Sequence, residues 1–305
     1  MQYEIGNTEV PYVTTLEGTT AGPTAMVTAL IHGNEICGAV ALAQLLSSNY
    51  SPLRGRLIVA FANVAAFSQF DSTHPYASRF VDEDMNRLWS RETLNGTRKS
   101  IELARARELR HFAEAADFLL DLHSTSLPAP AMLLCGSREK GRNLAAKMGY
   151  PFYVVADTGH TSGVRLRDFG EFNDGTSAKA SMLVECGQHF DSDSPTVAQK
   201  SIIAFLKACG MLDGTPENFP ALPNRRCQQF IEVSHAITIR SDGFAFSREF
   251  ECFETIAKAG TRIAQDGTRE IVTPYDDCVL VMPARHPSRG QTAVRLGRNV
   301  TGGKD

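Results

Sequence analysis

Two short motifs in this sequence carry side chains of the types that bind metal ions. His32 and Glu35 place an imidazole and a carboxylate three positions apart. A second imidazole, His123, follows the mainly apolar run 119–122. Two imidazoles and one carboxylate form a three-ligand set for zinc and leave the fourth tetrahedral position open, which is typical of catalytic zinc sites. The pattern therefore predicts a metal-dependent hydrolase.

Each half of this pattern also has an ordinary structural explanation. Glu35 could stand at the N-terminus of a helix, where a carboxylate interacts favourably with the helix dipole. The residues after His123 are Ser and Thr, which could cap a turn after a buried strand. Asp121 lies two positions before His123, so in a strand both side chains point to the same side. A carboxylate in that position could hold the second ring nitrogen of a metal-binding histidine.

A third group of polar residues occupies a predicted loop between positions 78 and 89. It contains Arg79, Asn86 and Arg87. The guanidinium group of arginine stays charged and matches the planar shape of a carboxylate, so this loop could bind a substrate carboxylate. In the alternative, the two arginines pair with the acidic residues between them, Asp82, Glu83 and Asp84.

Glu185 directly follows the apolar run 182–184. A carboxylate at the end of a buried strand is costly unless another group uses it. Glu185 could act as a general base toward water at a metal site. It could also simply bond a neighbouring loop, and we interpret the nearby His189 as a loop residue.

The elements that must position these residues alternate between strands and helices over the first two thirds of the chain. Apolar runs predict strands at residues 25–31, 56–61, 118–122, 131–134, 152–155 and 182–184. Amphipathic patterns predict helices at residues 35–46, 100–116, 139–147 and 197–208. This alternation predicts an α/β fold whose mixed, largely parallel sheet has helices on both faces. His32 and His123 would then lie at the carboxyl ends of strands, where ligands bind in such sheets.

The last third of the sequence has a different pattern. Residues 213–226 are rich in turn-forming residues and predict a linker. Short strands are expected after it at residues 229–233, 236–239, 245–253, 270–272, 278–282 and 293–296, with glycine-containing turns between them. We therefore expect an α/β catalytic domain at residues 1–212 and a small all-β domain at residues 227–305, which would cap the active site.

The composition excludes several other classes of protein. Of the 305 residues, 43% are hydrophobic and 21% charged, and the formal net charge is -3, so there is no basic excess for binding nucleic acid or membranes. No apolar run reaches the roughly 18 residues that a transmembrane helix needs, and the N-terminal residues lack the pattern of a secretory signal. Seven scattered cysteines without a Cys-x-x-Cys pair favour reduced thiols in a cytoplasmic protein. The sequence does not determine the oligomeric state, and a homo-oligomer is compatible with it.

The four groups together, in their order along the chain, resemble the succinylglutamate desuccinylase and aspartoacylase family, which is related to the zinc carboxypeptidases. The resemblance covers residues 25–187, and the predicted small β domain also fits the architecture of that family. It implies that His32, Glu35 and His123 bind one zinc ion per chain.

The resemblance also implies roles for the other polar residues. Glu185 would be the general base that activates the zinc-bound water. Arg79 would polarise the scissile carbonyl and stabilise its oxyanion, while Asn86 and Arg87 would hold the α-carboxylate of the substrate. The implied activity is the deacylation of an N-acyl amino acid or a similar small amide that bears a carboxylate.

The residues that select the acyl group are not evident from the sequence. Candidates without a motif behind them are Tyr275, Arg165, Arg167 and Lys179, so succinyl, acetyl and other small acyl groups stay open. Two other functions are compatible with the metal-binding pattern. One is a carboxypeptidase-like zinc peptidase, and the other is a non-catalytic protein that binds zinc or a ligand. A non-catalytic binding protein would be expected to lack Glu185 or Arg79, and both residues are present.

Overall fold

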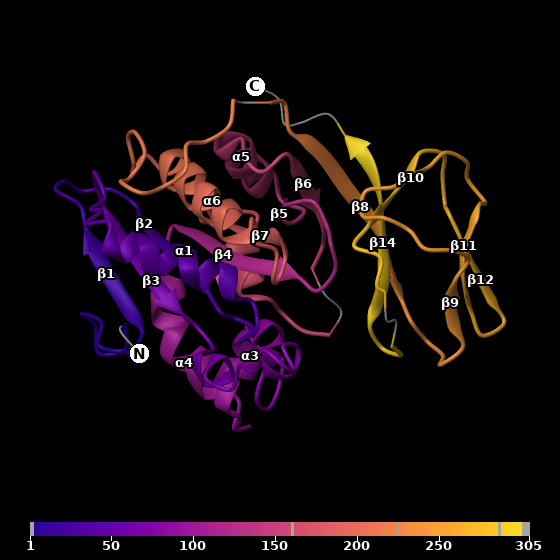
Figure 1. Ribbon diagram of the computed structural model, residues 1–305, viewed down its shortest axis with the longest axis horizontal. Helices are drawn as coiled ribbons and strands as arrows, with labels where there is room; N and C mark the ends of the chain where they lie inside the picture. Colours follow the sequence, from indigo (N-terminus) through magenta and orange to yellow (C-terminus); the bar gives the residue numbers. More distant parts are fainter. Residues whose placement is uncertain (1–2, 160–161, 225, 286–287, 301–305) are drawn as a thin grey trace.

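The computed structural model of the chain describes residues 3–159, 162–224, 226–285 and 288–300 (Figure 1). Within these residues, eleven strands form one large sheet, and helices cover its first half on both faces. In the order in which they lie across the sheet, these strands are β1 (Val13–Glu17), β3 (Arg56–Phe61), β2 (Thr24–Ala29), β4 (Phe118–Thr125), β7 (Ala180–Gln188), β5 (Met132–Leu134), β6 (Tyr153–Ala156), β8 (Gln229–Thr238), β14 (Thr292–Val300), β13 (Cys278–Val281) and β10 (Thr255–Ile256).

The strand directions confirm the predicted mixed, largely parallel sheet. Strand β2 pairs in parallel with β3 and β4, β4 pairs in parallel with β7, and β6 pairs in parallel with β5 and β8. Strand β5 is antiparallel to β7, and β1 is antiparallel to β3 at the edge of the sheet. Strand β1 at the sheet edge was not predicted from the sequence, because its polar threonines interrupt the apolar pattern of a strand.

Two layers of helices enclose the parallel part of this sheet. Helices α1 (Ile36–Ser47), α5 (Glu139–Met148) and α6 (Ser194–Ala208) pack on one face, and their apolar residues share one core. Helices α3 (Arg91–Asn95) and α4 (Ile101–Ala115) share a second core on the other face. The short helical segments are α2 (Val64–Phe67), η1 (Ala77–Arg79), η2 (Met85–Arg87), η3 (Leu166–Asp168) and η4 (Gly170–Phe172). The fold class predicted from the sequence is therefore confirmed.

Local sequence signals explain where several helices begin and end. The hydroxyl of Ser100 accepts a hydrogen bond from the backbone N–H of Leu103 at the N-terminus of α4, 3.0 Å away. Such a cap satisfies one of the backbone donors that a helix start leaves free. Helix α5 ends at Gly149, whose φ of 64° lies in the left-handed region that glycine adopts without strain. The bounds of α1, α4, α5 and α6 lie within a few residues of the four predicted helices, whereas α2 and α3 were not predicted.

Two strands are longer than the apolar runs that predicted them, so polar residues expected at or after their ends lie within the strands. Strand β4 continues through His123 to Thr125, and β7 continues through Glu185 to Gln188. The prediction that Glu185 follows the end of its strand was therefore wrong. His123 and Glu185 are direct neighbours across the parallel pair β4–β7, so their side chains leave the sheet on the same face.

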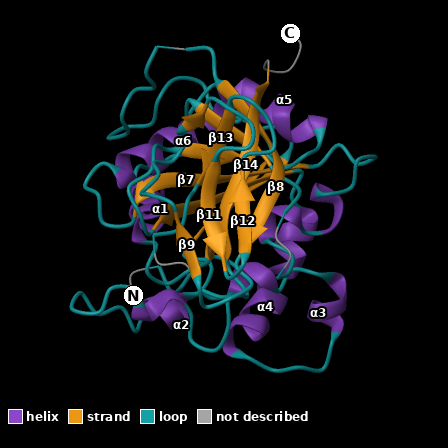
Figure 2. Cartoon of the chain, turned by 90° about the vertical axis from the view of Figure 1, so that its right-hand side faces the viewer, coloured by secondary structure: helices purple, strands orange, loops and turns teal. Residues whose placement is uncertain are grey.

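The large sheet continues into the C-terminal part of the chain. Strand β8 pairs with β6 on one side and with β14 on the other, so no break in the sheet separates the two halves (Figure 1). The strands β9 (Phe244–Phe246), β11 (Arg262–Asp266) and β12 (Arg269–Val272) form a second, three-stranded sheet (Figure 2). The division into domains at residues 212 and 227 stays a prediction.

Some predicted C-terminal strands were wrong in detail. Residues 229–233 and 236–238 belong to one long strand, β8, and most of residues 245–253 are irregular. Strands β10 and β11 were not predicted. Within the described part of the chain, no helix is long and apolar enough to cross a membrane. All seven cysteines are free thiols.

Candidate functional site

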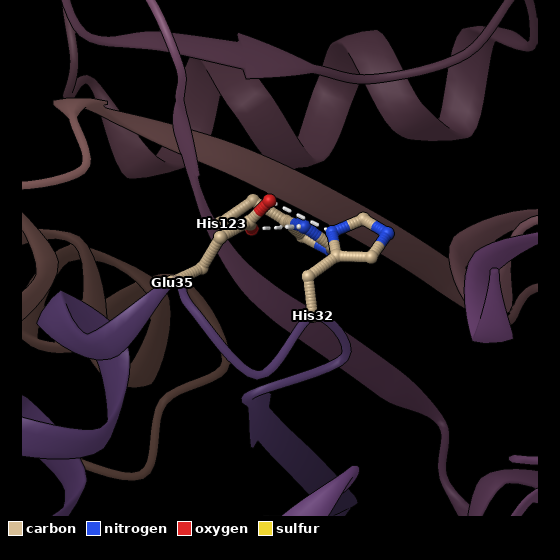
Figure 3. A group of neighbouring side chains, drawn as sticks. All are labelled: His32, Glu35 and His123. Carbon is tan, nitrogen blue, oxygen red and sulfur yellow. Dashed lines mark hydrogen bonds and ion pairs between the residues drawn. The ribbon is translucent and has the colours of Figure 1, made fainter. Parts of the chain in front are cut away.

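The predicted metal ligands come together in the fold. The carboxylate of Glu35 lies between two imidazoles, with Oε1 2.7 Å from Nδ1 of His32 and Oε2 2.7 Å from Nδ1 of His123 (Figure 3). All three side chains are buried. One potential ligand atom from each residue lies within 4.8 Å of the other two. Two nitrogens and one carboxylate oxygen, in a buried cluster, are a donor set that suits zinc.

The ordinary explanation for Glu35 does not describe this arrangement. Glu35 is the residue before the first turn of α1, but its side chain does not cap the helix. Its Oε2 instead accepts a hydrogen bond from the backbone N–H of Ser124 at 3.2 Å, in addition to its contact with His123. The carboxylate of Glu35 therefore contacts β4 and does not bind the backbone N–H groups at the start of α1.

A second carboxylate contacts each imidazole at Nε2, the ring nitrogen that does not face Glu35. Nε2 of His123 lies 2.8 Å from Oδ2 of Asp121, as the two-residue spacing predicted, and Nε2 of His32 lies 2.9 Å from Oδ1 of Asp84. A carboxylate that accepts a proton from Nε2 leaves the lone pair on Nδ1 free for a metal, and this arrangement is common around metal-binding histidines. Both Nδ1 atoms face Glu35, so the surroundings of the cluster also fit a metal ion.

The loop that carries His32 and Glu35 is fixed by its backbone. Leu30 has a φ of 62°, an uncommon conformation for a residue other than glycine, and it is buried just before His32. Gly33 was predicted to allow a tight turn, but its φ is not in the left-handed region. Its lack of a side chain matters because a Cβ there would lie 2.5 Å from backbone atoms of Ala66 and Ser78. Its N–H also donates to the carbonyl of Arg79 at 3.0 Å. This bond joins the loop of His32 and Glu35 to the loop at residues 78–89, which we call the arginine loop.

Electrostatics in the cluster follow from these contacts. Burial opposes the charged form of Glu35, but His32 and His123 outweigh it and lower the pKa of Glu35 well below its usual range. Burial likewise opposes the charged form of His123, while Asp121 and Glu35 raise its pKa well above its usual range. The buried carboxylates therefore favour a positive charge between the imidazoles, which is the charge that a metal cation brings.

Glu185 lies beside this cluster with a free side-chain oxygen. Its Oε2 is buried and has no hydrogen-bond partner among the described residues. Burial raises the pKa of Glu185 to about 8. An unpartnered buried carboxyl oxygen is costly, and such groups with shifted pKa values concentrate at functional sites.

The arginine loop also reaches the cluster. Nη1 of Arg79 lies 3.2 Å from Oε1 of Glu35, and its Nη2 lies 2.9 Å from Nε2 of His32. Asp84 accepts from Nη2 of Arg79 at 3.4 Å and lies 3.7 Å from Nη2 of Arg87. The alternative in which the arginines pair with neighbouring acids is thus confirmed for Asp84.

The other two acidic residues of this loop have different partners. Oδ2 of Asp82 accepts from the backbone N–H of Ile101, and Glu83 pairs with Arg98. Asn86 uses its Oδ1 to accept from the backbone N–H of Leu166 at 2.9 Å. Its amide nitrogen is not used in this contact.

A cavity of 1680 Å³ opens over these residues. The predicted metal ligands, Arg79, Asn86, Arg87 and Glu185 all line it. Other parts of its wall come from the C-terminal third of the chain and include Phe244, Phe250, Met282 and Arg295. The three predicted metal ligands, the three residues of the loop at 78–89 and Glu185 therefore meet in one cavity that both parts of the chain line.

The other candidates from the sequence lie in different places. Arg165 lines the cavity, but its guanidinium group is bound to Asp157 and Asp168. Arg167 donates to Asp168 and to backbone and side-chain oxygens behind the cavity wall. The hydroxyl of Tyr275 bonds Ser234, and Lys179 bonds the carbonyl of Glu114.

Three further residues belong to the site. Two of them, Asp84 and Arg295, were not proposed from the sequence, and the third, His189, was interpreted as a loop residue. Asp84 holds His32, and Arg295 lines the cavity from β14. His189 also lines the cavity, and its Nδ1 lies 2.8 Å from the hydroxyl of Ser124. Burial lowers the pKa of His189 to about 4. A signal for Asp84 existed in its position between the two arginines, whereas nothing in the pattern near Arg295 indicated a cavity.

The fold and the site together define an α/β protein with a buried His–Glu–His cluster that could bind a metal beside a large cavity. The sequence profile described as the succinylglutamate desuccinylase/aspartoacylase catalytic domain matches residues 21–207, more than half of the chain. The chain belongs to this family. Its members are desuccinylases and aspartoacylases, hydrolases of amides, so membership supports a hydrolase of the deacylase type.

Solved structures with the same fold cover nearly the whole chain. A succinylglutamate desuccinylase from Vibrio cholerae has a TM-score of 0.70 and 18% identity, over 95% of this chain and 86% of the other. A succinylglutamate desuccinylase/aspartoacylase from Rhodobacter sphaeroides has a TM-score of 0.68 and 18% identity, over 94% and 89%. The product-bound ectoine utilization protein from Ruegeria pomeroyi has a TM-score of 0.62 and 19% identity, over 95% and 88%. These matches extend the shared fold into the C-terminal strands.

Proposed function

We propose that this protein is a zinc-dependent amidohydrolase that removes the acyl group from an N-acyl amino acid or a similar small amide bearing a carboxylate. One observation carries the proposal. The His32–Glu35–His123 cluster and Glu185 line the same cavity, Oε2 of Glu185 has no hydrogen-bond partner among the described residues, and arginines stand beside both. Family membership supports the same type of reaction.

His32, Glu35 and His123 would hold one zinc ion per chain. When bound, zinc supplies Lewis acidity that polarises a carbonyl group and makes water more acidic. The chain contributes the orientation of the ligands. Asp84 and Asp121 keep the two rings turned so that both Nδ1 atoms face Glu35.

Glu185 would be the general base and then the general acid. Its Oε2 accepts a proton from the attacking water, and it returns this proton to the nitrogen of the leaving amine. A C–O bond forms at the acyl carbon while the C–N bond breaks, so the products are a carboxylic acid and an amine. A group whose pKa is near the working pH suits both transfers. The environment of Glu185 supports this role because burial keeps its pKa high.

The arginine loop would orient the substrate and stabilise charge. Arg79 is about one third exposed to the cavity, with 36% of its side chain accessible, and would donate to the carbonyl oxygen as negative charge develops there. The amide nitrogen of Asn86, which makes no hydrogen bond to any described residue, and the guanidinium group of Arg87 would bind the α-carboxylate.

A small substrate is favoured over a peptide by the walls of the cavity. Residues of the C-terminal third of the chain line the same cavity as the cluster, and their side chains would leave less room for a long peptide. This favours a deacylase over a carboxypeptidase-like peptidase. The free thiols of all seven cysteines favour a reducing compartment, and we place the protein in the cytoplasm.

The test is an assay of the zinc-loaded protein against a panel of N-acyl amino acids, including N-acetyl diamino acids, together with metal analysis of protein purified without added zinc. We expect about one equivalent of metal and hydrolysis of at least one panel member. Glu185→Gln should lower kcat by about 10²- to 10⁴-fold and keep the metal. Glu249→Gln removes the same charge from the cavity wall and serves as the control.

Two results would contradict the proposal. Full activity of Glu185→Gln would remove this residue from the mechanism. Robust cleavage of long peptides, without hydrolysis of any N-acyl amino acid, would favour the peptidase instead.

A further inference from the structure

His189 is a buried histidine in the wall of the cavity that the proposed mechanism does not use. Only 3% of the residue is exposed, yet it lines the cavity together with Glu35 and Glu185. It directly follows β7, and its backbone N–H donates to the carbonyl of Thr125 at 2.9 Å. This bond joins the end of β7 to the end of β4, the strand that carries His123 of the metal cluster.

One ring nitrogen of His189 is bound by the protein and the other is not. Nδ1 lies 2.8 Å from the hydroxyl of Ser124. Nε2 makes no hydrogen bond to any described residue, and it is not among the fully buried polar atoms that lack a partner there, so solvent reaches it. The rings of Tyr76 and Phe190 lie beside the imidazole, with centroids 6.0 and 5.7 Å away. Nε2 is therefore a polar atom of a held ring that is open to the cavity.

The imidazole of His189 is uncharged at neutral pH. Burial lowers its pKa to about 4, with Arg79 acting in the same direction and Glu35 in the opposite one. An uncharged ring offers no ion pair to a carboxylate. A hydroxyl at Nδ1 is compatible with both neutral tautomers, so Nε2 either donates or accepts one hydrogen bond. A hydroxyl group of a ligand pairs with Nε2 in either case, because a hydroxyl both donates and accepts.

The contacts of the metal cluster indicate which part of the substrate His189 would meet. At one end of the cluster, Asp84 lies 3.7 Å from Nη2 of Arg87 and 2.9 Å from Nε2 of a cluster histidine. At the other end, the N–H of Ser124 donates to the cluster carboxylate, and the hydroxyl of Ser124 contacts His189. Arg87 and His189 thus end one row of contacts with the cluster between them. A substrate with its α-carboxylate at Arg87 and its scissile carbonyl at the cluster would extend its acyl chain toward His189.

We propose that Nε2 of His189 forms a hydrogen bond with a hydroxyl group on the acyl chain of the substrate, so that the enzyme favours hydroxyacyl amino acids. This inference rests on the proposed function and names the acyl group that the proposed function leaves open. An apolar acyl chain would displace water from Nε2 and leave that nitrogen without a partner, which is unfavourable. A site built to bind a substrate hydroxyl discriminates against an analogue that lacks it for the same reason.

The experiment compares two probes of nearly equal size with the zinc-loaded enzyme. N-glycolylalanine carries a hydroxyl on its acyl chain, and N-propionylalanine carries a methyl group in the same place. We expect kcat/KM of the wild type to be about 10-fold higher for N-glycolylalanine. The hydroxyl also makes the neighbouring carbonyl somewhat more reactive. This effect is the same in every variant, so the decisive quantity is the change in the ratio of the two kcat/KM values between the wild type and the variants.

Two substitutions of His189 test its two ring nitrogens separately. The side-chain amide of asparagine reaches about as far as Nδ1, and that of glutamine about as far as Nε2. His189→Asn should therefore keep the contact with Ser124 and lower the ratio by about 5- to 10-fold, whereas His189→Gln should keep most of it. A purely structural role would change both probes alike and leave the ratio as it is. Ser126→Ala removes an exposed hydroxyl from the same cavity wall and serves as the control, with an unchanged ratio.

The outcomes distinguish the two proposals. A wild-type enzyme that hydrolyses N-acyl amino acids without preferring N-glycolylalanine, or an unchanged ratio in His189→Asn, overturns the role of His189 and leaves the proposed function intact. If His189→Asn does not fold, as thermal unfolding would show, His189→Leu takes its place, because leucine fills the site without a polar atom. A zinc-loaded wild type that hydrolyses no N-acyl amino acid in the wider panel contradicts the proposed function itself, and the role of His189 falls with it.

Discussion

Asp84 lies 2.9 Å from Nε2 of His32, on the side of the ring opposite to Glu35. The imidazole is therefore held between two carboxylates, one at each nitrogen. His123 is held in the same way, between Asp121 and Glu35. This repeated arrangement fixes the orientation of both rings before any metal binds, and it gives Asp84 a role that can be tested.

Asp84→Asn should weaken zinc binding by about 10- to 100-fold, because the amide is a poorer acceptor for the Nε2 proton of His32. The measurement is competition with a chelator of known affinity, followed by metal analysis. Asp82→Asn is the control, because it removes the same charge from the same loop. Asp82 accepts from the backbone N–H of Ile101 and does not contact His32, so the zinc affinity of this variant should stay close to that of the wild type. Equal losses in both variants would mean that the charge of the loop matters rather than the contact with His32.

The metal-binding part of the site was predictable because its residues have characteristic chemistry at short spacings. His32 and Glu35 belong to one loop, and Asp121 and His123 belong to a strand that its apolar residues make easy to predict. Asp84 was hidden among three consecutive acids, and only the folded loop shows which of them turns toward His32.

The contribution of the C-terminal third could not be predicted in the same way. Arg295 reaches the cavity through strand pairings between residues far apart in the sequence, β14 with β8 and β8 with β6. Such pairings depend on the packing of the whole sheet, and a local pattern of alternating residues does not contain them. The same reason explains why residues 229–239 were divided into two strands and why β10 and β11 were not predicted.

Gly33→Ala should destabilise the protein and weaken metal binding together. The new Cβ would lie 2.5 Å from backbone atoms of α2 and of Ser78, which cannot move aside as a flexible side chain can. Overpacking of this kind costs about 1–3 kcal/mol, and the strained loop carries His32 and Glu35. Thermal unfolding and zinc titration measure the two effects.

Gly175→Ala is the matched control for this substitution. A Cβ at Gly175 would meet its nearest neighbour, a side-chain nitrogen of Arg138, at 3.6 Å, which is an ordinary contact. Wild-type stability and zinc affinity in Gly33→Ala would show that the loop tolerates the methyl group, contrary to our expectation.

The buried pair of Asp157 and Arg165 should make stability depend on pH in acid. Although burial opposes the charged form, Arg165 lowers the pKa of Asp157 from 3.8 to about 2. Because the folded-state pKa is the lower one, the contribution to the free energy of unfolding is complete well above pH 3.8 and is lost as the pH falls through about 2. This difference in pKa corresponds to about 2 kcal/mol.

Denaturant unfolding of the wild type and of Asp157→Asn at several pH values tests this expectation. The variant should be less stable at pH 7 by about 3–5 kcal/mol, because it removes one of the two carboxylates that pair with the buried charge of Arg165. The gap should stay constant down to about pH 5 and narrow below about pH 4. A gap that widens in acid would contradict the sign of the predicted effect.

Arg79 and Arg87 should affect different kinetic constants, although both contact Asp84. Arg79 would meet the carbonyl oxygen where charge develops in the transition state, so Arg79→Met should lower kcat by about 10²- to 10³-fold with little change in KM. Arg87 would hold the α-carboxylate in the ground state and in the transition state alike, so Arg87→Met should raise KM by about 10- to 100-fold with a smaller effect on kcat.

Each of these two variants is a control for the other, because both remove one positive charge from beside Asp84. Steady-state kinetics on the preferred N-acyl amino acid give the two constants, and metal analysis is needed because Arg79 also contacts His32 and Glu35. With the metal retained in both variants, a loss of kcat in Arg79→Met and a rise of KM in Arg87→Met would support the assigned roles. The reverse pattern would exchange them, and identical changes in both constants would indicate that the two arginines act only by holding Asp84.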